Sequence, residues 1–478
     1  MPVIPNLLLL REWLQHCDNN HDCPQKRGKG SFWPKRIIFV GDSDPKKLSL
    51  VENQSLDEDY LVLSHRWGNP TEDEKRQFCN TKENRRLKDF FFEQLPKTFQ
   101  DTVQITRALG KQYLWIDALC IIQGDGGDWK SQANTMQNIF ANAYCTIAVT
   151  SAHNWKDGFL KSQSRFSDDG AQNTLASSAC QCHFDEDVDA GPLMQRAWVL
   201  QERVLSRRTI HFTTSHVYCE CGDGVICERL TKLIPPFGKE YFILDPHFLD
   251  RLWRSGYYRT IEFIQFLFQK YSTSGLTDET DRVIAIHSLV ERMEKVVQSK
   301  AKYGIFRFCL GSLLLWKRTE EQKPLIKYDD DQVPSWSWMA YSGGIEFILD
   351  PNPSFRVPRF EDLDFADDRS VLNVKVRNFG GSCRMGQNEE KYVILDGEEE
   401  VGSLWFDIAD QIRFEDCNCV IVGALDAEMK DHKVEDARKG YYMIIVQKED
   451  GDRGYKRVGV GIVRAQYVSE ECISSILR

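Results

Sequence analysis

The sequence predicts an α/β protein built around a parallel sheet. Between Tyr60 and Phe212, apolar strand segments alternate with amphipathic helix segments, a pattern typical of βαβ units with right-handed crossovers. Most of these strands lie next to a cluster of polar or aromatic residues. Ligands of open parallel sheets bind outside the carboxyl ends of the strands, because the loops and the helix N-termini converge there. We therefore expect clusters that are distant in the sequence to share one edge of the sheet.

Four such clusters stand beside predicted strands. They are residues 64–67 after the strand at 60–63, residues 117–123 after 113–116, residues 151–153 after 145–149, and residues 196–202 before the strand at 208–212.

Helices are predicted between these strands. The segment 96–110 begins with Pro96, ends with Gly110 and carries its apolar residues on one arc, which are helix start and stop signals. The segment 128–143 repeats this scheme, with Asp128 placed as an N-cap. A shorter helix is expected over residues 196–206.

Composition narrows the class of protein. The chain has 478 residues, 42% of them hydrophobic, which is enough for two or three packed domains. A formal net charge of -10 argues against nucleic-acid binding, which needs clustered lysine and arginine. The short apolar run at residues 7–10 lacks the flanks of a signal peptide, and no run reaches the ~20 residues that span a bilayer. The 15 cysteines, an odd number partly inside apolar segments, indicate reduced thiols and a cytoplasmic protein.

Four regions are predicted along the chain. Residues 1–55 form an N-terminal segment, and residues 56–230 form the α/β domain. Residues 231–325 are helical, with one helix over 246–271, capped by Asp245, and another over 278–316 that breaks near Gly304. Residues 326–478 are β-rich, with short apolar or alternating stretches at 371–376, 419–422 and 441–446.

Four motifs in this order resemble the heterokaryon-incompatibility (HET) domain of filamentous fungi. They are Tyr-Leu-Val-Leu-Ser-His-Arg-Trp-Gly at 60–68, Leu-Trp-Ile-Asp-Ala-Leu-Cys-Ile-Ile-Gln at 114–123, the segment 136–143, and Arg-Ala-Trp-Val-Leu-Gln-Glu at 196–202. The flanks at 13–17 and 334–338 also resemble such proteins. The resemblance implies a role in non-self recognition, with cell death as the output.

The HET domain is in turn similar to TIR domains, which have a flavodoxin-like parallel sheet with helices on both faces and in some branches cleave NAD. The strand that ends in Ser64-His65-Arg66 resembles the first TIR strand, and Glu202, four residues after Trp198, falls near the position of the TIR catalytic glutamate. This likeness implies NAD, or a related nucleotide, as a substrate rather than a bound cofactor. It also implies self-association or contact with other signalling proteins, and a non-catalytic adaptor is the alternative.

Glu202 is the candidate catalytic residue. A carboxylate beside the ribose would stabilise the oxocarbenium-like centre that forms when the nicotinamide–ribose bond breaks. The alternatives are an ion pair with Arg203 or Arg207, or a plain surface position. Trp198 shares a helix face with Glu202 and would either stack on a flat ring of the ligand or belong to the core.

The other cluster residues are candidates for binding the nucleotide. Arg66 would hold a phosphate and Ser64 a ribose or phosphate oxygen, unless Arg66 pairs with Asp117 instead. The complete predicted binding set is Ser64, His65, Arg66, Trp67, Asp117, Gln123, Ser151, Arg196 and Trp198.

The cysteines are expected to be plain thiols. Cys120, with His65 or His153 as its base, would form a nucleophilic pair, but its apolar neighbours favour an unreactive buried thiol. The alternative is zinc at Cys180, Cys182 and His183, or at Cys219, Cys221 and Cys227. The single-residue gaps in both sets are poor for a structural zinc site, so no metal is predicted.

Overall fold

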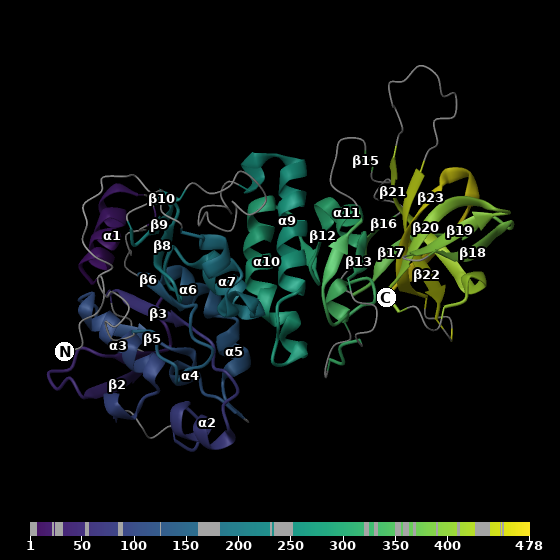
Figure 1. The fold of residues 1–478 in the computed structure, drawn as a ribbon. Coiled ribbons are helices and arrows are strands. Elements are labelled where there is room, and N and C mark those ends of the chain that lie inside the picture. The colour runs from purple at the N-terminus through teal and green to yellow at the C-terminus, as the bar shows by residue number, and fades with distance from the viewer. Residues whose placement is uncertain are drawn as a thin grey trace. The chain divides into compact units, whose positions relative to one another are not determined.

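The computed structural model describes most of the chain (Figure 1). The described residues are 7–21, 23, 32–52, 57–84, 89–124, 126–160, 182–229, 232–233, 252–319, 325–328, 333–348, 355–356, 363–366, 370–388, 391–408, 412–425, 440–449, 451 and 454–478. They fall into two compact units. Unit 1 comprises Met1–Phe248 with Ile284–Leu289, and unit 2 comprises Leu249–Val283 with Val290–Arg478.

Unit 1 contains a ten-stranded mixed sheet in the order β10-β9-β8-β7-β6-β3-β5-β1-β2-β4. Its strands are β1 (Arg36–Phe39), β2 (Lys47–Glu52), β3 (Tyr60–Ser64), β4 (Asp89–Phe91), β5 (Tyr113–Trp115), β6 (Cys145–Val149), β7 (Arg208–Phe212), β8 (Val217–Cys221), β9 (Gly224–Cys227) and β10 (Lys232–Leu233).

Four of these strands are parallel and form the centre of the sheet. β3 pairs with β5 on one side and β6 on the other, and β6 pairs with β7. β3, β6 and β7 are buried at every position, as expected for strands covered on both faces. The predicted parallel sheet is therefore present at the centre, where the strand order is second, first, third, fourth.

The outer strands differ from the prediction, because they are antiparallel. β1 runs antiparallel to β5 and continues through β2 to β4, and β8 runs antiparallel to β7 and continues through β9 to β10. The connections between β1 and β2 and along β7, β8, β9 and β10 are too short for a crossover helix, so each of these strands turns back beside the one before it. β1 also pairs with β5, and β2 with β4, although these strands are not consecutive in the chain. The sheet as a whole is mixed rather than parallel.

The described helices of unit 1 are α1 (Leu7–Asn20), α2 (Glu72–Phe78), α3 (Lys97–Ala108), α4 (Asp117–Cys120), α5 (Trp129–Ala133), α6 (Met136–Asn142) and α7 (Ala197–Leu205). The helices predicted near 96–110 and 196–206 are present as α3 and α7, and the helix predicted over 128–143 is divided; α2 and α4 were not predicted. The prediction of one helix over residues 128–143 is wrong, because α5 and α6 are separate helices. Asp128 stands before α5 without capping it. Its carboxylate instead accepts from Arg36 Nη2 at 2.5 Å and from the Ile122 backbone N–H at 2.9 Å.

Unit 2 begins with helices and short strands. Helix α9 spans Tyr257–Ser272. The predicted continuous helix over 246–271 is wrong, because residues 253–255 form a separate 3-10 helix and Gly256, with a φ of +94°, ends it; Pro246 lies outside the described residues. Helix α10 spans Ile284–Val297, with its residues 284–289 in unit 1. The predicted break near Gly304 is a hairpin of β11 (Ala301–Lys302) and β12 (Ile305–Phe306), and it is followed by α11 (Leu310–Leu314), β13 (Trp316–Arg318) and β14 (Ile345–Phe347). None of the described helices is long and apolar enough to cross a membrane.

The β-rich C-terminal region is confirmed as a second ten-stranded sheet, largely antiparallel. Strand pairing closes a ring in which β17 pairs with β21, β21 with β22, β22 with β23, β23 with β24, and β24 with β17. The strands are β15 (Phe355–Arg356), β16 (Leu363–Phe365), β17 (Leu372–Phe379), β18 (Cys383–Asn388), β19 (Lys391–Asp396), β20 (Glu399–Phe406), β21 (Cys417–Leu425), β22 (Gly440–Lys448), β23 (Tyr455–Arg464) and β24 (Val468–Leu477).

Arg457 of β23 joins this sheet to the preceding segment of unit 2. Arg457 is 1% exposed, and its guanidinium donates to both carboxylate oxygens of Asp407, at 2.9 and 3.2 Å. It also donates to the carbonyls of Leu314 and Trp316 and lies 3.3 Å from the centre of the Trp316 ring. The planar guanidinium satisfies all of these partners at once, which an ammonium group cannot do.

Replacement of Arg457 should therefore be costly. We expect Arg457→Lys to lower the free energy of unfolding by about 3–5 kcal/mol, because it leaves Asp407 and two carbonyls incompletely paired in the core. The control is Arg464→Lys, which alters the exposed pair with Glu399 and should cost at most about 1 kcal/mol. Urea unfolding curves measure both, and equal losses would contradict this account of Arg457.

Candidate functional site

The end of β3 and helix α7 bring Ser64 and Glu202 together. Ser64 is the last residue of β3 and lies level with Ala148 of β6, while α7 leads directly into β7. Every residue of α7 is buried, so the helix is held tightly against its surroundings. The Ser64 hydroxyl donates to Glu202 Oε2 at 2.5 Å, and the Glu202 side chain keeps an exposed fraction of only 8%.

Two further predicted residues surround this pair. Arg196, at the start of α7, donates from Nη1 to the carbonyl oxygen of His65 at 2.7 Å. Asp117, at the start of α4, accepts from Trp67 Nε1 at 2.8 Å, and one of its oxygens lies 3.9 Å from His65 Nδ1. Three of the four sequence clusters therefore meet at the carboxyl end of β3.

The buried carboxyl of Glu202 has a strongly shifted pKa. Burial raises the pKa of Glu202 from its usual 4.5 to about 7, against the opposing effects of the Ser64 hydrogen bond and the Arg196 charge, and the Asp117 charge raises it further. The side chain therefore exists in both protonation states near neutral pH. Such a carboxyl can hold or release a proton, or carry a negative charge, under physiological conditions.

His65 is neutral at this pH. Burial lowers the pKa of His65 to about 4, the Asp117 charge opposes that effect, and the Arg196 charge adds to it. In the described part of the chain, His65 Nε2 and the side-chain amide of Gln201 are buried without hydrogen-bond partners. Buried polar atoms are usually paired, so these two side chains, which adjoin Ser64 and Glu202 in the sequence, are suited to binding a polar ligand.

Aromatic rings pack around the polar residues. The rings of Trp67 and Trp155 lie 5.5 Å apart, and Trp155 is itself 6.0 Å from Phe99. Trp198 is buried and meets Trp129 edge to face at 5.3 Å. Trp198 thus has a core contact, as one of its two predicted roles requires.

The loop after β6 is fixed next to the β3 loop. Asp101 of α3 is fully buried and accepts from the backbone N–H groups of Phe159 and Leu160, at 2.8 and 3.0 Å. Gly68 has a φ of +74°, and a Cβ there would lie 2.5 Å from Asn154 Cβ, so only glycine allows the two loops to approach this closely.

The remaining predicted residues do not contact the Ser64–Glu202 pair through any described hydrogen bond. Ser151 is half-buried and its backbone N–H donates to the Phe212 carbonyl, while Gln123 donates to the Asp117 and Ile121 carbonyls at 3.3 Å. Arg66 is half-buried and forms no ion pair with Asp117 among the described residues, so the alternative that paired them does not hold.

Arg203, the residue after Glu202 on α7, has partners other than Glu202. Arg203 forms a buried ion pair with Glu220, donating from Nε at 3.0 Å and from Nη2 at 3.1 Å, and also pairs with Asp189. His211 Nε2 lies 2.7 Å from the same Glu220 carboxylate. The predicted alternative of a Glu202–Arg203 ion pair is therefore wrong. The alternative of a plain surface position is wrong as well, because Glu202 is buried.

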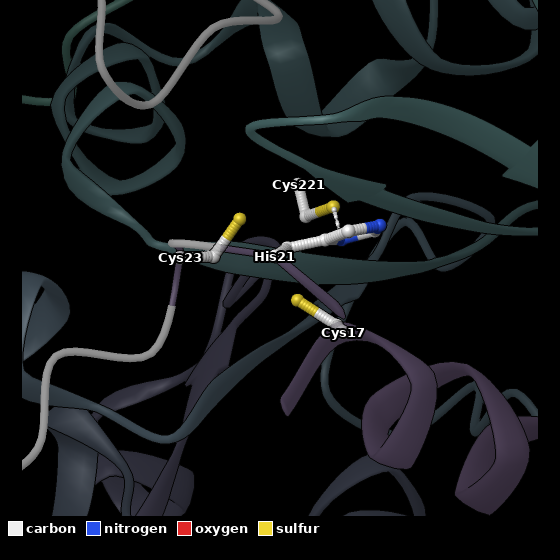
Figure 2. A group of neighbouring side chains, drawn as sticks. All are labelled: Cys17, His21, Cys23 and Cys221. Atoms are coloured by element: carbon white, nitrogen blue, oxygen red, sulfur yellow. Dashed lines mark hydrogen bonds between the residues drawn. The ribbon is translucent and has the colours of Figure 1, made fainter. Parts of the chain in front are cut away.

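Three sets of cysteines bear on the predicted thiol and zinc sites. Cys120 is buried, and burial raises its pKa to about 12, which keeps the thiol protonated. Cys182 Sγ lies 2.6 Å from Cys227 Sγ, and Cys180 is outside the described residues. Cys221 instead joins Cys17, His21 and Cys23, none of which the sequence had singled out as ligands (Figure 2). The spacing Cys17-x₃-His21-x-Cys23 was a signal for this group, but its fourth member is 200 residues away from His21.

The fold and the site define an α/β domain with a buried polar centre at the end of β3. Residues 60–202 match the family model of the heterokaryon incompatibility protein (HET), so this part of the chain is a HET domain. This match begins with β3, ends at Glu202 and includes every residue of the predicted site. The match to the HET family supports a role of the chain in heterokaryon incompatibility. No curated protein and no solved structure matches the chain.

The pKa shift of Glu202 predicts how its replacement changes stability with pH. A raised folded-state pKa means that the ionised carboxyl destabilises the fold. This destabilisation is absent below pH 4.5, grows as the pH rises from 4.5 to about 7, and stays constant above that. Glu202→Gln removes the charge and can still accept from Ser64. We expect it to raise the free energy of unfolding by a few kcal/mol at pH 8, on the order of the pKa shift, and by little at pH 4.5.

Glu220→Gln is the matched control, because Glu220 is also a buried carboxylate. Burial raises its pKa, but Arg203 and His211 outweigh this effect and lower it overall, so its contribution is present at neutral pH and is lost in acid. This variant should lose about 3–5 kcal/mol at pH 8. Thermal and urea unfolding from pH 4.5 to pH 8 measure both variants, and at pH 8 Glu202→Gln should be more stable than the wild type and Glu220→Gln less stable. A Glu202→Gln variant that is destabilised at pH 8 would contradict the raised pKa of Glu202.

Proposed function

We propose that this HET-domain protein acts in non-self recognition and induces cell death by hydrolysing NAD at the nicotinamide–ribose bond. The observation that supports the chemistry is the Ser64–Glu202 pair, a buried carboxyl with a pKa of about 7 inside the residues that match the HET family. The HET match itself supports the biological role.

Glu202 supplies the charge that the reaction needs. Cleavage breaks the bond between ribose C1′ and the nicotinamide nitrogen, and nicotinamide leaves as a neutral molecule with the electron pair of that bond. The ribose is left with oxocarbenium character, which an ionised Glu202 stabilises. Water then adds to C1′ and loses its proton, which gives ADP-ribose, nicotinamide and one proton.

Binding of NAD and ionisation of Glu202 support each other. The nicotinamide ring carries a positive charge, so its approach favours the ionised carboxyl and lowers the pKa of Glu202 in the complex. Ser64 keeps the carboxylate oriented through its hydroxyl. Desolvation of the site strengthens the attraction between the carboxylate and the developing positive charge.

The surrounding residues are assigned to the rest of the nucleotide. Arg66 and Arg196 are the cations suited to the phosphates. His65 Nε2 and the Gln201 amide are suited to ribose or carboxamide hydrogen bonds. Trp67, Asp117, Gln123, Ser151 and Trp198 complete the proposed binding set.

The strand order supports the remote likeness to TIR domains. The order β5-β3-β6-β7 is second, first, third, fourth along the parallel strands, which is how a flavodoxin-like sheet begins. We extend the proposal to a flavodoxin-like, TIR-like HET domain that works in the cytoplasm and is switched on by self-association.

Nicotinamide release from NAD by the purified full-length chain tests the activity. Glu202→Gln should lower kcat/KM for this release by roughly 10²–10³-fold and abolish cell death, with no loss of folded protein. Glu93→Gln, an exposed carboxylate paired with Lys46, is the control and should leave both unchanged. Cell death that persists at equal protein level in Glu202→Gln would instead assign the chain to the non-catalytic adaptors.

The pH profile gives a second, independent check. Because the ionised carboxyl is the active form, kcat/KM for nicotinamide release should rise with pH and reach half of its plateau near the free-enzyme pKa of about 7. The midpoint of kcat should lie at lower pH, since bound NAD favours ionisation. A kcat/KM that falls as the pH rises from 6 to 8 would contradict an ionised Glu202 as the active form.

A further inference from the structure

Four potential metal ligands meet where the end of α1 lies against β8 (Figure 2). Cys17 is in the last turn of α1, His21 and Cys23 follow that helix, and Cys221 ends β8. One ligand atom from each residue, a sulfur or a ring nitrogen, lies within 4.8 Å of every other. These residues come from two segments about 200 positions apart, so only the fold brings them together.

The three thiols point toward a shared centre rather than into an ordinary apolar core. Cys17, Cys23 and Cys221 are 2%, 5% and 6% exposed, and they form a small buried cluster of their own. Figure 2 shows their sulfur atoms surrounding the same space, with the His21 ring beside Cys221. Three thiols and one imidazole are the ligands that zinc prefers in structural sites, and soft thiolates disfavour magnesium and calcium.

The spacing of the ligand atoms fits a tetrahedral ion. Zinc–ligand distances of ~2.0–2.3 Å place the ligands of a tetrahedron ~3.5–3.8 Å apart. His21 Nδ1 already lies 3.4 Å from Cys221 Sγ. No two of the four ligand atoms are more than 4.8 Å apart, so small side-chain rotations are enough to bring them to zinc-binding distances.

His21 also has the partner that a metal-binding histidine requires. Its Nε2 lies 3.2 Å from a carboxylate oxygen of Asp223, in the turn after β8, while its Nδ1 faces Cys221. An Nε2–H that donates to a carboxylate leaves Nδ1 unprotonated and oriented toward the thiols, which is the arrangement found behind zinc-bound histidines.

We propose that Cys17, His21, Cys23 and Cys221 bind one zinc ion in a closed, structural Cys₃His site. With four protein ligands the ion has no open position for substrate. Its role is to clamp the segment after α1 onto β8.

The position of the cluster agrees with a structural role. In the strand register, Cys221 of β8 lies opposite Arg208, the first residue of β7. Ser64 of β3 lies opposite Ala148 of β6, which in turn lies opposite His211, near the end of β7. The cluster and the Ser64–Glu202 pair therefore lie toward opposite ends of the parallel strands.

A second set of contacts holds α1 at the same place. Arg208 donates to the Leu14 carbonyl at 3.2 Å and pairs with Asp18 at 2.7 Å, and Tyr144 donates to Asp18 at 2.8 Å. These contacts position the Cys17 end of α1 beside β8, so that a metal ion would complete an arrangement that the fold already sets up.

Metal analysis of the full-length protein, purified without chelator, tests the proposal. We expect about one zinc ion per chain by mass spectrometry, and a lower melting temperature after removal of the ion with a strong chelator. Addition of zinc to the chelated protein should restore the melting temperature. Metal-free protein, iron in place of zinc, or a disulfide between two of the three cysteines in peptide mapping would each overturn the proposal.

Paired variants locate the site. Cys221→Ala should lose the zinc, whereas Cys219→Ala, a buried thiol two positions earlier on the same strand, should retain it. His21→Ala and the exposed helical His16→Ala form a second pair with the same expected contrast. Zinc retained by both Cys221→Ala and His21→Ala would reject this ligand set.

Asp223→Ala provides a readout that does not depend on loss of a ligand. It should weaken zinc binding about 10–100-fold in competition with a chelating dye, because His21 loses the carboxylate that orients it. If the ligand variants fail to fold, the wild-type protein can still be tested by reaction of its thiols with a mercurial, which displaces zinc that is bound to cysteine. Release of about one zinc ion per chain on that reaction supports the site, and release of none rejects it.

Discussion

The hydrogen bond from Ser64 to Glu202 is the interaction on which the proposed chemistry depends. It joins the end of β3 to α7, and it places an ionisable carboxyl where burial raises its pKa to about 7. The charges of Arg196 and Asp117 act on it in opposite directions. The site is therefore poised between its protonated and ionised forms, and small changes on ligand binding are enough to select one of them.

The rest of unit 1 explains how this carboxyl is kept in place. The Arg203–Glu220 ion pair sits one residue away from Glu202 on α7 and fixes the helix against β8. Asp101 fixes the loop after β6, and Gly68 allows the β3 loop to approach that loop closely. At the other end of the parallel strands, the contacts of Arg208 with α1 and the proposed zinc site hold the N-terminal segment. Both ends of the same strands are thus fastened by buried polar groups rather than by apolar packing alone.

The sequence predicted the centre of this arrangement better than its surroundings. The alternation of strands and helices identified β3, β5, β6 and β7, and the carboxyl-end rule correctly brought Ser64, Asp117, Arg196 and Glu202 toward one place. The antiparallel outer strands were not predicted, because β1 pairs with β5 and β2 with β4 only in the folded sheet. The division of residues 128–143 into α5 and α6 was not predicted, nor was the hydrogen bond between Asp128 and the distant Arg36. The cysteine cluster was missed for the same reason, because Cys221 joins Cys17 and Cys23 only through the folded sheet.

The protonation of Glu202 is the property that most directly tests this account. Infrared difference spectra of the wild-type protein minus Glu202→Gln should show the C=O stretch of a protonated, buried carboxylic acid at pH 5.5, and this band should disappear with a midpoint near pH 7. The carboxylate bands should appear over the same range. A difference spectrum that already shows only carboxylate at pH 5.5 would mean that Glu202 titrates normally, and it would contradict the central claim.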